Sequence, residues 1–440
     1  MNESVSASVS EEYDPRSYDP TSPDVKPNVE EHFANLREKC PVHRHKFSDE
    51  QLKALTDNPF VTGQGDEFYT LTRYRDVEEC LVNPEKFLSA EGSGPERIAV
   101  PENGGSLAWS DGAAHKRSRR LAQPSVSPKV IAPLIPMLQE RIDDLIDELA
   151  SKGRADIMAD FATPLTSGML THLLGLPTEM EPDVKEWALA ILSIWGGTEE
   201  AAKRGANAMA AISETVAAVG PALVAGVESG DVAPSALSML LTTTDENDKL
   251  FGHDEVVQAF VQMIAGGFES SATAIANGVY LFCKNPGERS KLLDQPELIN
   301  TAVEEVLRYM APIEGLARTT SEDLTIGGVH MSEGTKVRPT FASANMDDEE
   351  FDDPTQFKID RPKAELQKHL TFGKGPHTCI GNNLARQELR LAFATLFRRI
   401  PTLALDPAGT PTRSEVMVIH GFDHLPVKWD PVSVLPRDAS

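Results

Sequence analysis

The longest helical pattern in the chain runs from Glu255 to Cys283. A helix of roughly 28 residues is about 42 Å long at ~1.5 Å per residue, so it crosses a whole domain. Its middle, residues 265–271, is Ala-Gly-Gly-Phe-Glu-Ser-Ser, which places an acid and two hydroxyl groups in an otherwise apolar stretch. A mid-helix glycine costs about 1 kcal/mol relative to alanine, and a buried unpaired carboxylate costs more. These residues alone fit either a bend in a core helix or a functional site.

A second feature is Cys379, which lies among glycines just before another helical pattern formed by Leu389, Phe393, Leu396 and Ile400. We therefore expect Cys379 in a tight loop at a helix N-terminus. The helix dipole and free backbone N–H groups would stabilise a thiolate there. Glycines at 373, 375 and 381 would let a flat, bulky ligand lie close to the main chain. The alternative is a buried, inert cysteine in a glycine-rich turn.

Charge and cysteine usage limit the class of protein. The chain has 42 basic and 67 acidic side chains, and its formal net charge of −25 opposes general binding to nucleic acid or an anionic membrane. Its four cysteines lie far apart without a C-x-x-C pair, which argues against a zinc knuckle or a disulfide framework. The first 30 residues contain no apolar run, so neither a signal peptide nor a membrane anchor is expected. These features predict a soluble cytoplasmic protein.

The loop around Cys379 resembles the haem-binding signature of the cytochrome P-450 family at every position that the signature fixes: Phe372, Gly373, Gly375, His377, Cys379 and Gly381. The resemblance implies haem b (iron protoporphyrin IX) as cofactor and Cys379 as the axial iron ligand, whose thiolate favours O–O cleavage. It also implies that His377 hydrogen-bonds a haem propionate and that Phe372 packs near the thiolate. The implied fold is mostly α with small β-sheets (α+β). It is triangular, with the haem between the long central helix and the helix that follows the Cys379 loop.

The middle of the long helix resembles the family's oxygen-binding groove, where the helix opens locally and an acid–alcohol pair relays protons. Gly266, Gly267 and Glu269 match this pattern. Ser270 stands where threonine is usual, so the hydroxyl is kept but the methyl that helps fix its rotamer is lost. The resemblance therefore implies a proton relay through Glu269 and Ser270.

A basic cluster begins at His115 in this acidic chain. His115 and Arg119 are one helical turn apart and could hold one anion together. The family resemblance implies that both meet haem propionates and that Arg318 is a further propionate partner. Other cations are expected to form a surface for an electron donor, although a solvated basic face is the alternative: Lys116, Arg117, Arg120, Lys374, Arg386 and Arg390.

One pair of charges is expected to be structural. Glu305 and Arg308 share a helix face at i, i+3 spacing. In the family such a pair is buried and joins an arginine from a later loop, for which Arg361 is the match.

The domain organisation follows from composition. Residues 1–28 resemble a disordered tail, because they are rich in Pro, Ser and acid and poor in large apolar groups. Residues 29–432 are expected to form a single haem-thiolate monooxygenase domain, followed by a C-terminal tail at 433–440. Within the domain, Phe68–Thr72 is expected to be an edge strand.

The favoured function is a soluble bacterial-type monooxygenase. It would insert one atom of O₂ into a small or medium apolar substrate, by hydroxylation or O-dealkylation. The chain has no flavin or nicotinamide fingerprint, so electrons are expected from a separate ferredoxin with its reductase; a monomer is expected. A peroxide-driven peroxygenase on the same haem and a non-enzymatic haem gas sensor are the alternatives. The Glu269–Ser270 pair favours the monooxygenase, because neither alternative needs a proton relay.

Overall fold

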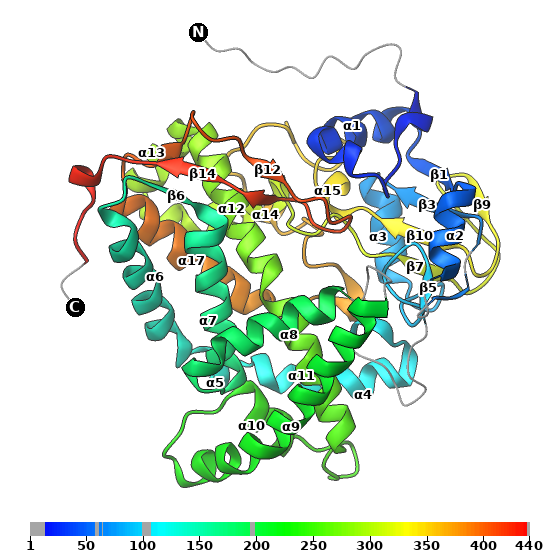
Figure 1. Cartoon of the computed structure of the whole chain (residues 1–440). Helices are drawn as coiled ribbons and strands as arrows, with labels where there is room; N and C mark the ends of the chain where they lie inside the picture. Colours follow the sequence, from blue (N-terminus) through cyan, green and yellow to red (C-terminus); the bar gives the residue numbers. More distant parts are fainter. Residues whose placement is uncertain (1–13, 58–60, 64, 99–106, 194–198, 438–440) are drawn as a thin grey trace.

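The computed structural model describes residues 14–57, 61–63, 65–98, 107–193 and 199–437. Helices make up most of it, which confirms the predicted mostly α fold (Figure 1). The helices are α1 Val29–Lys39, α2 Asp49–Asp57, α3 Tyr74–Val82, α4 Gly112–Ala122, α5 Pro128–Ile131, α6 Leu134–Ala150, α7 Thr163–Leu174, α8 Glu181–Ser193, α9 Glu199–Ser229, α10 Ala236–Thr242, α11 His253–Gly267, α12 Glu269–Lys284, α13 Pro286–Asp294, α14 Ile299–Tyr309, α15 Phe341–Ala344, α16 Lys363–Leu366 and α17 Asn382–Arg399.

The strands form one five-stranded sheet and several small ones. The large sheet has the order β1 Val42–Lys46, β3 Glu67–Leu71, β10 Lys336–Pro339, β7 Arg318–Thr320 and β4 Phe87–Leu88. The small sheets pair β11 Ala404–Leu405, β14 Pro426–Lys428 and β6 Arg154–Asp156; β12 Thr412–Arg413 and β13 Phe422–His424; β2 Val61–Gly63 and β5 Arg97–Ile98; and β8 Leu324–Ile326 and β9 Val329–Met331. Figure 1 shows the large sheet on one side of the molecule, with α6, α7 and α17 on the other.

The predicted edge strand at Phe68–Thr72 is a central strand. β3 pairs antiparallel with β1 and parallel with β10, so both of its edges are covered. Four of its five residues are buried. Because both faces of this strand are covered, apolar and polar residues alternate only partly along it. The partial alternation therefore indicates a buried central strand and not an edge strand.

The prediction of a disordered tail at residues 1–28 is wrong for residues 14–28. Residues 1–13 lie outside the part of the chain that the structure describes. Two short 3₁₀ turns, Pro15–Ser17 and Pro23–Asn28, pack on the domain. Tyr18 is only 1% exposed and lies edge-on to Phe33, with ring centroids 6.1 Å apart. Composition missed this because the segment docks on a core that the rest of the chain builds.

The predicted C-terminal tail is likewise anchored as far as residue 437. The backbone N–H of Leu435 donates to the carbonyl of Arg399 at 2.8 Å. Arg437 forms ion pairs with Asp144 and Asp147 of α6, both at 2.6 Å. This end of the chain therefore joins α17 to α6.

The main apolar core lies where α12 and α17 cross. Phe393 and Phe397 of α17 are fully buried, and Phe397 lies edge-on to Phe282 of α12 at 4.8 Å between centroids. Gly278 makes this approach possible, since a Cβ there would overlap the Phe393 ring. Close packing of these helices fixes the loop that precedes α17.

The long helix predicted for Glu255–Cys283 is divided in two. α11 ends at Gly267 and α12 begins at Glu269, with Phe268 between them at φ −107° and ψ −62°. Two successive glycines at the end of α11 weaken the helix at this point.

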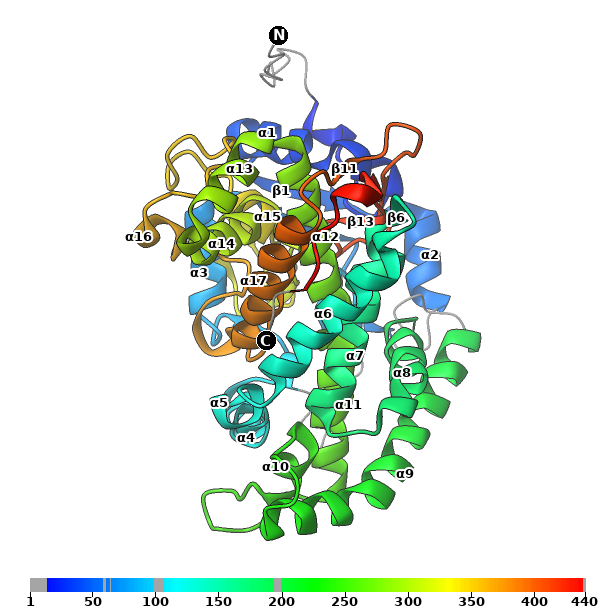
Figure 2. The same ribbon diagram turned by 90° about the vertical axis from the view of Figure 1, so that its left-hand side faces the viewer.

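One helix in the described part of the chain, α9, is long and apolar enough to cross a membrane by length and composition alone. Its 31 residues are rich in alanine, which raises its apolar content without large side chains. It packs against α8, α10 and α11 (Figure 2). A single helix of this kind is weak evidence for a membrane span.

Candidate active site

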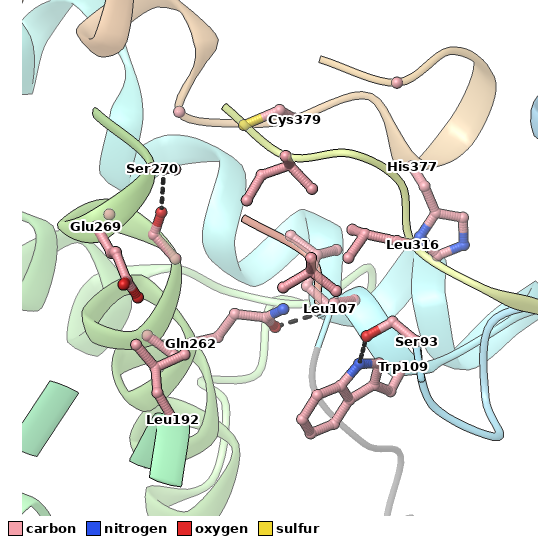
Figure 3. A pocket seen from close by; sticks show the side chains of 18 of the residues that line it. Ser93, Leu107, Trp109, Leu192, Gln262, Glu269, Ser270, Leu316, His377 and Cys379 are labelled. Carbon is pink, nitrogen blue, oxygen red and sulfur yellow. Dashed lines mark hydrogen bonds between the residues drawn. The ribbon is translucent and has the colours of Figure 1, made fainter. Parts of the chain in front are cut away.

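A cavity of about 1650 Å³ lies between α11–α12, α4 and the loop that carries Cys379. Its size exceeds the roughly 300–1,000 Å³ of a pocket for one drug-sized ligand, so there is room for a cofactor and a substrate together. Figure 3 shows Cys379 and His377 along one side of the cavity, with Leu192 and Trp109 on the opposite side of the view. Most of the lining is apolar, and Cys379 is the one thiol among the described residues that form it.

The Cys379 loop is folded tightly onto itself. The backbone N–H of Cys379 donates to the carbonyl of Phe372 at 2.8 Å. Gly373 and Gly375 have φ of +68° and +74°, a region that favours glycine. A Cβ on Gly375 would also lie 2.8 Å from the carbonyl oxygen of Leu81. The loop thus holds Cys379 at the start of α17, where the sequence predicted it.

Burial opposes the thiolate in the chain itself. It raises the pKa of the Cys379 thiol above its ordinary value, although N–H groups of Gly381 and Asn382 and the Arg119 guanidinium lower it. The predicted stabilisation by backbone N–H groups is therefore present, but burial outweighs it in the chain itself. A metal that displaces the thiol proton would supply the missing stabilisation.

No cluster of three or more His, Cys, Asp or Glu side chains among the described residues could hold a metal ion by itself. Cys379 is surrounded by protein but its thiol faces the open cavity, and a single thiol placed there suits an iron whose remaining ligands come mostly from a porphyrin. Gly266 supports this fit, because nothing lies within 4 Å of the position its Cβ would take. Cys379 and Gly266 both line the cavity that a flat macrocycle would enter.

Four basic side chains gather at one side of the cavity. The rings of His115 and His377 are 4.0 Å apart between centroids. Arg119 donates to the carbonyls of Pro376 and Thr378 at 2.7 and 3.0 Å, and Arg318 donates to that of Ala317 at 3.0 Å. The structure therefore brings together the residues predicted to hold propionates.

Among the residues that the structure describes, this basic group lacks anions of matching charge. His115 is only 4% exposed, and its Nε2 has no hydrogen-bond partner among the residues described. Burial, then the nearby His377, lowers the pKa of His115 to about 4. The nearest carboxylate, Asp111, lies 3.9 Å from His377 and accepts hydrogen bonds from the backbone of Ser89 and Ala90. Haem propionates fit a site with this charge and an unpaired nitrogen.

The break between α11 and α12 opens onto the cavity. The Ser270 hydroxyl donates to the carbonyl of Gly266 at 3.0 Å, across the break (Figure 3). Gly267 packs against Leu170, where a Cβ would lie 3.1 Å from its Cδ1. Burial raises the pKa of Glu269, and the Asp423 carboxylate raises it further. An acid and an alcohol thus adjoin the same opening, as the sequence predicted.

Sequence reasoning missed a second acid, Glu388 of α17. It lines the cavity but is 1% exposed, and its Oε2 has no partner in the described part of the chain. Burial raises the pKa of Glu388 to about 7, and its hydrogen bond with Ser271 lowers it by less. The signal was present: Leu384, Glu388 and Ala392 share one helix face, and the two neighbours are apolar.

The predicted charge cluster away from the cavity is assembled and fully buried. Arg308 donates to Glu305 at 2.7 and 2.9 Å, and Arg361 donates to Glu305 at 3.0 Å. Arg308 also donates to the carbonyls of Asn345 and Pro354. These bonds tie α14 to the segment that leads into the Cys379 loop.

Half of the predicted basic surface is neutralised within the chain. Arg117 pairs with Glu255 at 2.6 Å and with Asp245 at 3.2 Å. Lys374 pairs with Glu78, and Arg386 pairs with Glu304 while covering the Phe372 ring. Within the described residues, three of the six form no ion pair: Lys116, Arg120 and Arg390. Arg120 instead donates to the carbonyls of Thr244 and Asp245.

Comparisons with known proteins agree with this geometry. The sequence profile described as Cytochrome P450 matches residues 229–415. The chain is 32% identical over 428 residues to the nocardicin C N-oxygenase of Nocardia uniformis subsp. tsuyamanensis, covering 94% of this chain and 99% of the relative. It is 29% identical over 404 residues to the 6-deoxyerythronolide B hydroxylase of Saccharopolyspora erythraea, covering 90% and 95%. Its fold is similar to the crystal structure of the enzyme CYP109B1 from Bacillus subtilis, at 27% identity and TM-score 0.72, covering 90% and 98%.

Proposed function

Because this chain belongs to the cytochrome P450 family, we propose that it inserts one atom of O₂ into a small or medium apolar molecule held in the cavity beside Cys379. The family membership makes it a haem b monooxygenase with a cysteine thiolate ligand. The observation that carries the proposal is the Cys379 thiol in a largely apolar cavity, with the buried imidazole of His115 beside it and its Nε2 without a partner among the described residues. When bound, haem supplies the activation of O₂.

The chain's own residues would hold the cofactor from two sides. Cys379 would bind the iron, and His115, Arg119, Arg318 and His377 would hold the propionates. A propionate at His115 would give its Nε2 the partner that it lacks within the described structure. A propionate at Arg318 would offset the effect of burial, which lowers the pKa of the Arg318 guanidinium.

Two acids beside the cavity would manage protons. Glu269 adjoins Ser270 at the helix break, and Glu388 hydrogen-bonds Ser271. A carboxyl with a pKa of about 7 can give up and regain a proton at neutral pH, which suits a relay. We propose that Glu269 and Ser270 deliver protons toward the cavity and that Glu388 resupplies them through Ser271.

The cavity lining favours an apolar substrate. Side chains such as Leu107, Ile313, Leu316 and Val418 face the cavity, and the polar side chains of Gln258 and Gln262 lie on the α11 side. Gln262 accepts a hydrogen bond from the backbone of Ala108, which leaves its amide N–H₂ as a donor. The relatives include enzymes named for a nocardicin and for 6-deoxyerythronolide B. A secondary metabolite with a few hydrogen-bond acceptors fits this lining.

The electron donor is proposed to be a separate ferredoxin with its reductase, acting on a cytoplasmic monomer. A surface hollow of about 510 Å³ is lined by Lys116, Arg119, Arg120 and residues 375–377, so it adjoins the Cys379 loop. Basic residues without ion pairs in the described chain make this hollow a better docking site than Arg117 or Lys374. Complementary charge would mainly speed the encounter.

The test of function is spectroscopic and then catalytic. Reduced holoenzyme under carbon monoxide should show the red-shifted Soret band of a thiolate ligand, and Cys379→His should lose it. A histidine-type band in freshly purified wild-type protein would contradict the assignment of Cys379. Turnover with NADPH, ferredoxin reductase and ferredoxin distinguishes a monooxygenase from a peroxygenase, which would form product only with added hydrogen peroxide.

A further inference from the structure

Residues 14–28, here called the N-terminal strap, reach the rim of the cavity. Asp19, Thr21 and Ser22 line the same cavity as Cys379. Phe47 and Gln51, which lie next to them, line it too. None of the roles described above involves the strap.

The strap has a fixed position on the domain. Tyr18 is buried against His43 of β1, with ring centroids 5.4 Å apart. Gln51 of α2 donates to Asp19 at 3.1 Å and to Thr21 at 2.7 Å. The cavity rim at this point is therefore a built surface.

Lys26 connects the strap to the part of the cavity wall that residues 416–419 form. Its Nζ lies 2.6 Å from Glu314 and donates to the carbonyls of Met417 at 3.0 Å and Ile419 at 2.9 Å. Met417 and Ile419 both line the cavity. The side chain is 5% exposed, so all three donors of a buried ammonium are used inside the protein.

The wall that Lys26 holds is also tied to neighbouring segments by main-chain hydrogen bonds. Glu314 donates its backbone N–H to Val418 at 2.8 Å, and Ile313 pairs with Ile419 as an isolated bridge. Arg338 completes the network, since it donates to Glu314 at 2.6 Å and to the carbonyl of Met417 at 3.1 Å. Without Lys26, the carbonyl of Ile419 would lose the charged donor that holds it, and a buried acceptor without a donor is costly.

We propose that the N-terminal strap is a specificity element of the cavity. Asp19, Thr21 and Ser22 shape its entrance, and Lys26 is a positioning residue that sets the wall at 416–419. The proposal rests on the proposed function, because it takes the cavity to be the substrate site. A bulky molecule contacts both the entrance and this wall, whereas a small one fills only the space near Cys379.

Two haem-binding azoles of different size test the proposal in the holoenzyme. Lys26→Met keeps the length of the side chain but removes its donors. The dissociation constant of clotrimazole, which is bulky, should rise roughly tenfold, the equivalent of about 1.4 kcal/mol. That of imidazole should stay within about twofold, a change of under half a kcal/mol. Lys53→Met on α2, where the lysine is exposed, is the matched control and should change neither.

A second variant works at the entrance and leaves Lys26 intact. Ser22→Trp adds bulk where the strap lines the cavity, so it should slow clotrimazole association and spare imidazole. If Lys26→Met does not fold, Ser22→Trp still tests whether the N-terminal strap determines specificity. Unchanged clotrimazole binding in the folded variants, or equal weakening of both azoles, would overturn the proposal. A wild-type protein that shows no azole-induced optical shift would instead contradict the proposed haem site.

Discussion

Gly278 of α12 lies directly against the ring of Phe393 of α17, with no room for a β-carbon between them. α17 begins three residues after Cys379 and is held in the core by this contact. The position of Cys379 thus depends on how closely two helices approach in the apolar core.

Gly278→Ala should destabilise the protein, because the added methyl forces Phe393 to move. Overpacking of this kind costs about 1–3 kcal/mol, more than the ~1 kcal/mol gained from helix propensity. Urea unfolding and haem content measure the effect. Gly287→Ala on α13 is the control, since nothing lies within 4 Å of a Cβ there. Equal stability of the two variants would contradict this account of the crossing.

Glu305→Gln should remove the negative charge that two buried arginines share. Breaking a buried charge pair costs about 3–5 kcal/mol, because the remaining charge is left without a partner. The free energy of unfolding should fall by that order. Glu186→Gln is the control, because it removes the exposed ion pair with Arg204. It should lower the free energy of unfolding by no more than about 1 kcal/mol. Similar losses would mean that the buried cluster is not structural.

His43 should make the protein less stable in mild acid. Burial, then the nearby His45, lowers the pKa of His43 to about 4. The unfolded chain takes up a proton as pH falls below the ordinary value of 6.5, but the folded chain does not until about pH 4, so stability falls across this window. The loss between pH 7 and pH 5 is about 2 kcal/mol.

His43→Phe should reduce the acid loss by about 2 kcal/mol and leave the part due to His115, because phenylalanine keeps an aromatic ring beside Tyr18 and cannot be protonated. The measurement is urea unfolding at pH 7 and pH 5. His330→Phe, at an exposed position, is the control and should leave the pH dependence as it is in wild type. If His43→Phe loses as much stability as wild type does, another group causes the acid sensitivity.

Glu388→Gln should raise stability at pH 8 while it impairs turnover. The folded pKa of about 7 lies above the ordinary 4.5, so the wild type loses stability as pH rises between these values. Glutamine does not ionise, so the variant should be more stable than the wild type by about 3 kcal/mol at pH 8 and equally stable near pH 4.5. Product formed per NADPH should fall and released hydrogen peroxide should rise, with substrate affinity unchanged. Normal coupling would remove Glu388 from the proton path.

Lys116→Glu should slow reduction by an acidic ferredoxin, most clearly at low ionic strength, because exposed charges act at long range only when salt is scarce. Peroxide-driven turnover should be unaffected. Lys284→Glu at the end of α12 makes the same charge change away from the Cys379 loop and serves as the control. If both variants accept electrons at the wild-type rate, the donor docks elsewhere. Arg117→Glu is less informative, since it would also repel Glu255 and Asp245.

Local spacing predicted much of the site. The Cys379 loop, the acid beside Ser270 and the Glu305–Arg308 pair each lie within a few residues of chain, so a pattern can reveal them. Partners that meet across the fold could not be found in this way. Arg117 is neutralised by residues more than 120 positions away, and Lys26 by Glu314, 288 positions away. Glu388 was missed because α17 carries many polar residues, although its apolar neighbours on the same helix face, Leu384 and Ala392, indicated a buried position.

The N-terminal strap is made of residues that contribute nothing to the helices around Cys379. For protein engineering this means that the shape of the entrance and the chemistry at the iron are encoded in separate stretches of sequence. A library confined to residues 19–22 and 416–419 would vary what enters the cavity while the Cys379 loop, the helix break and the buried charge cluster stay constant. Such a library should retain haem in most of its members.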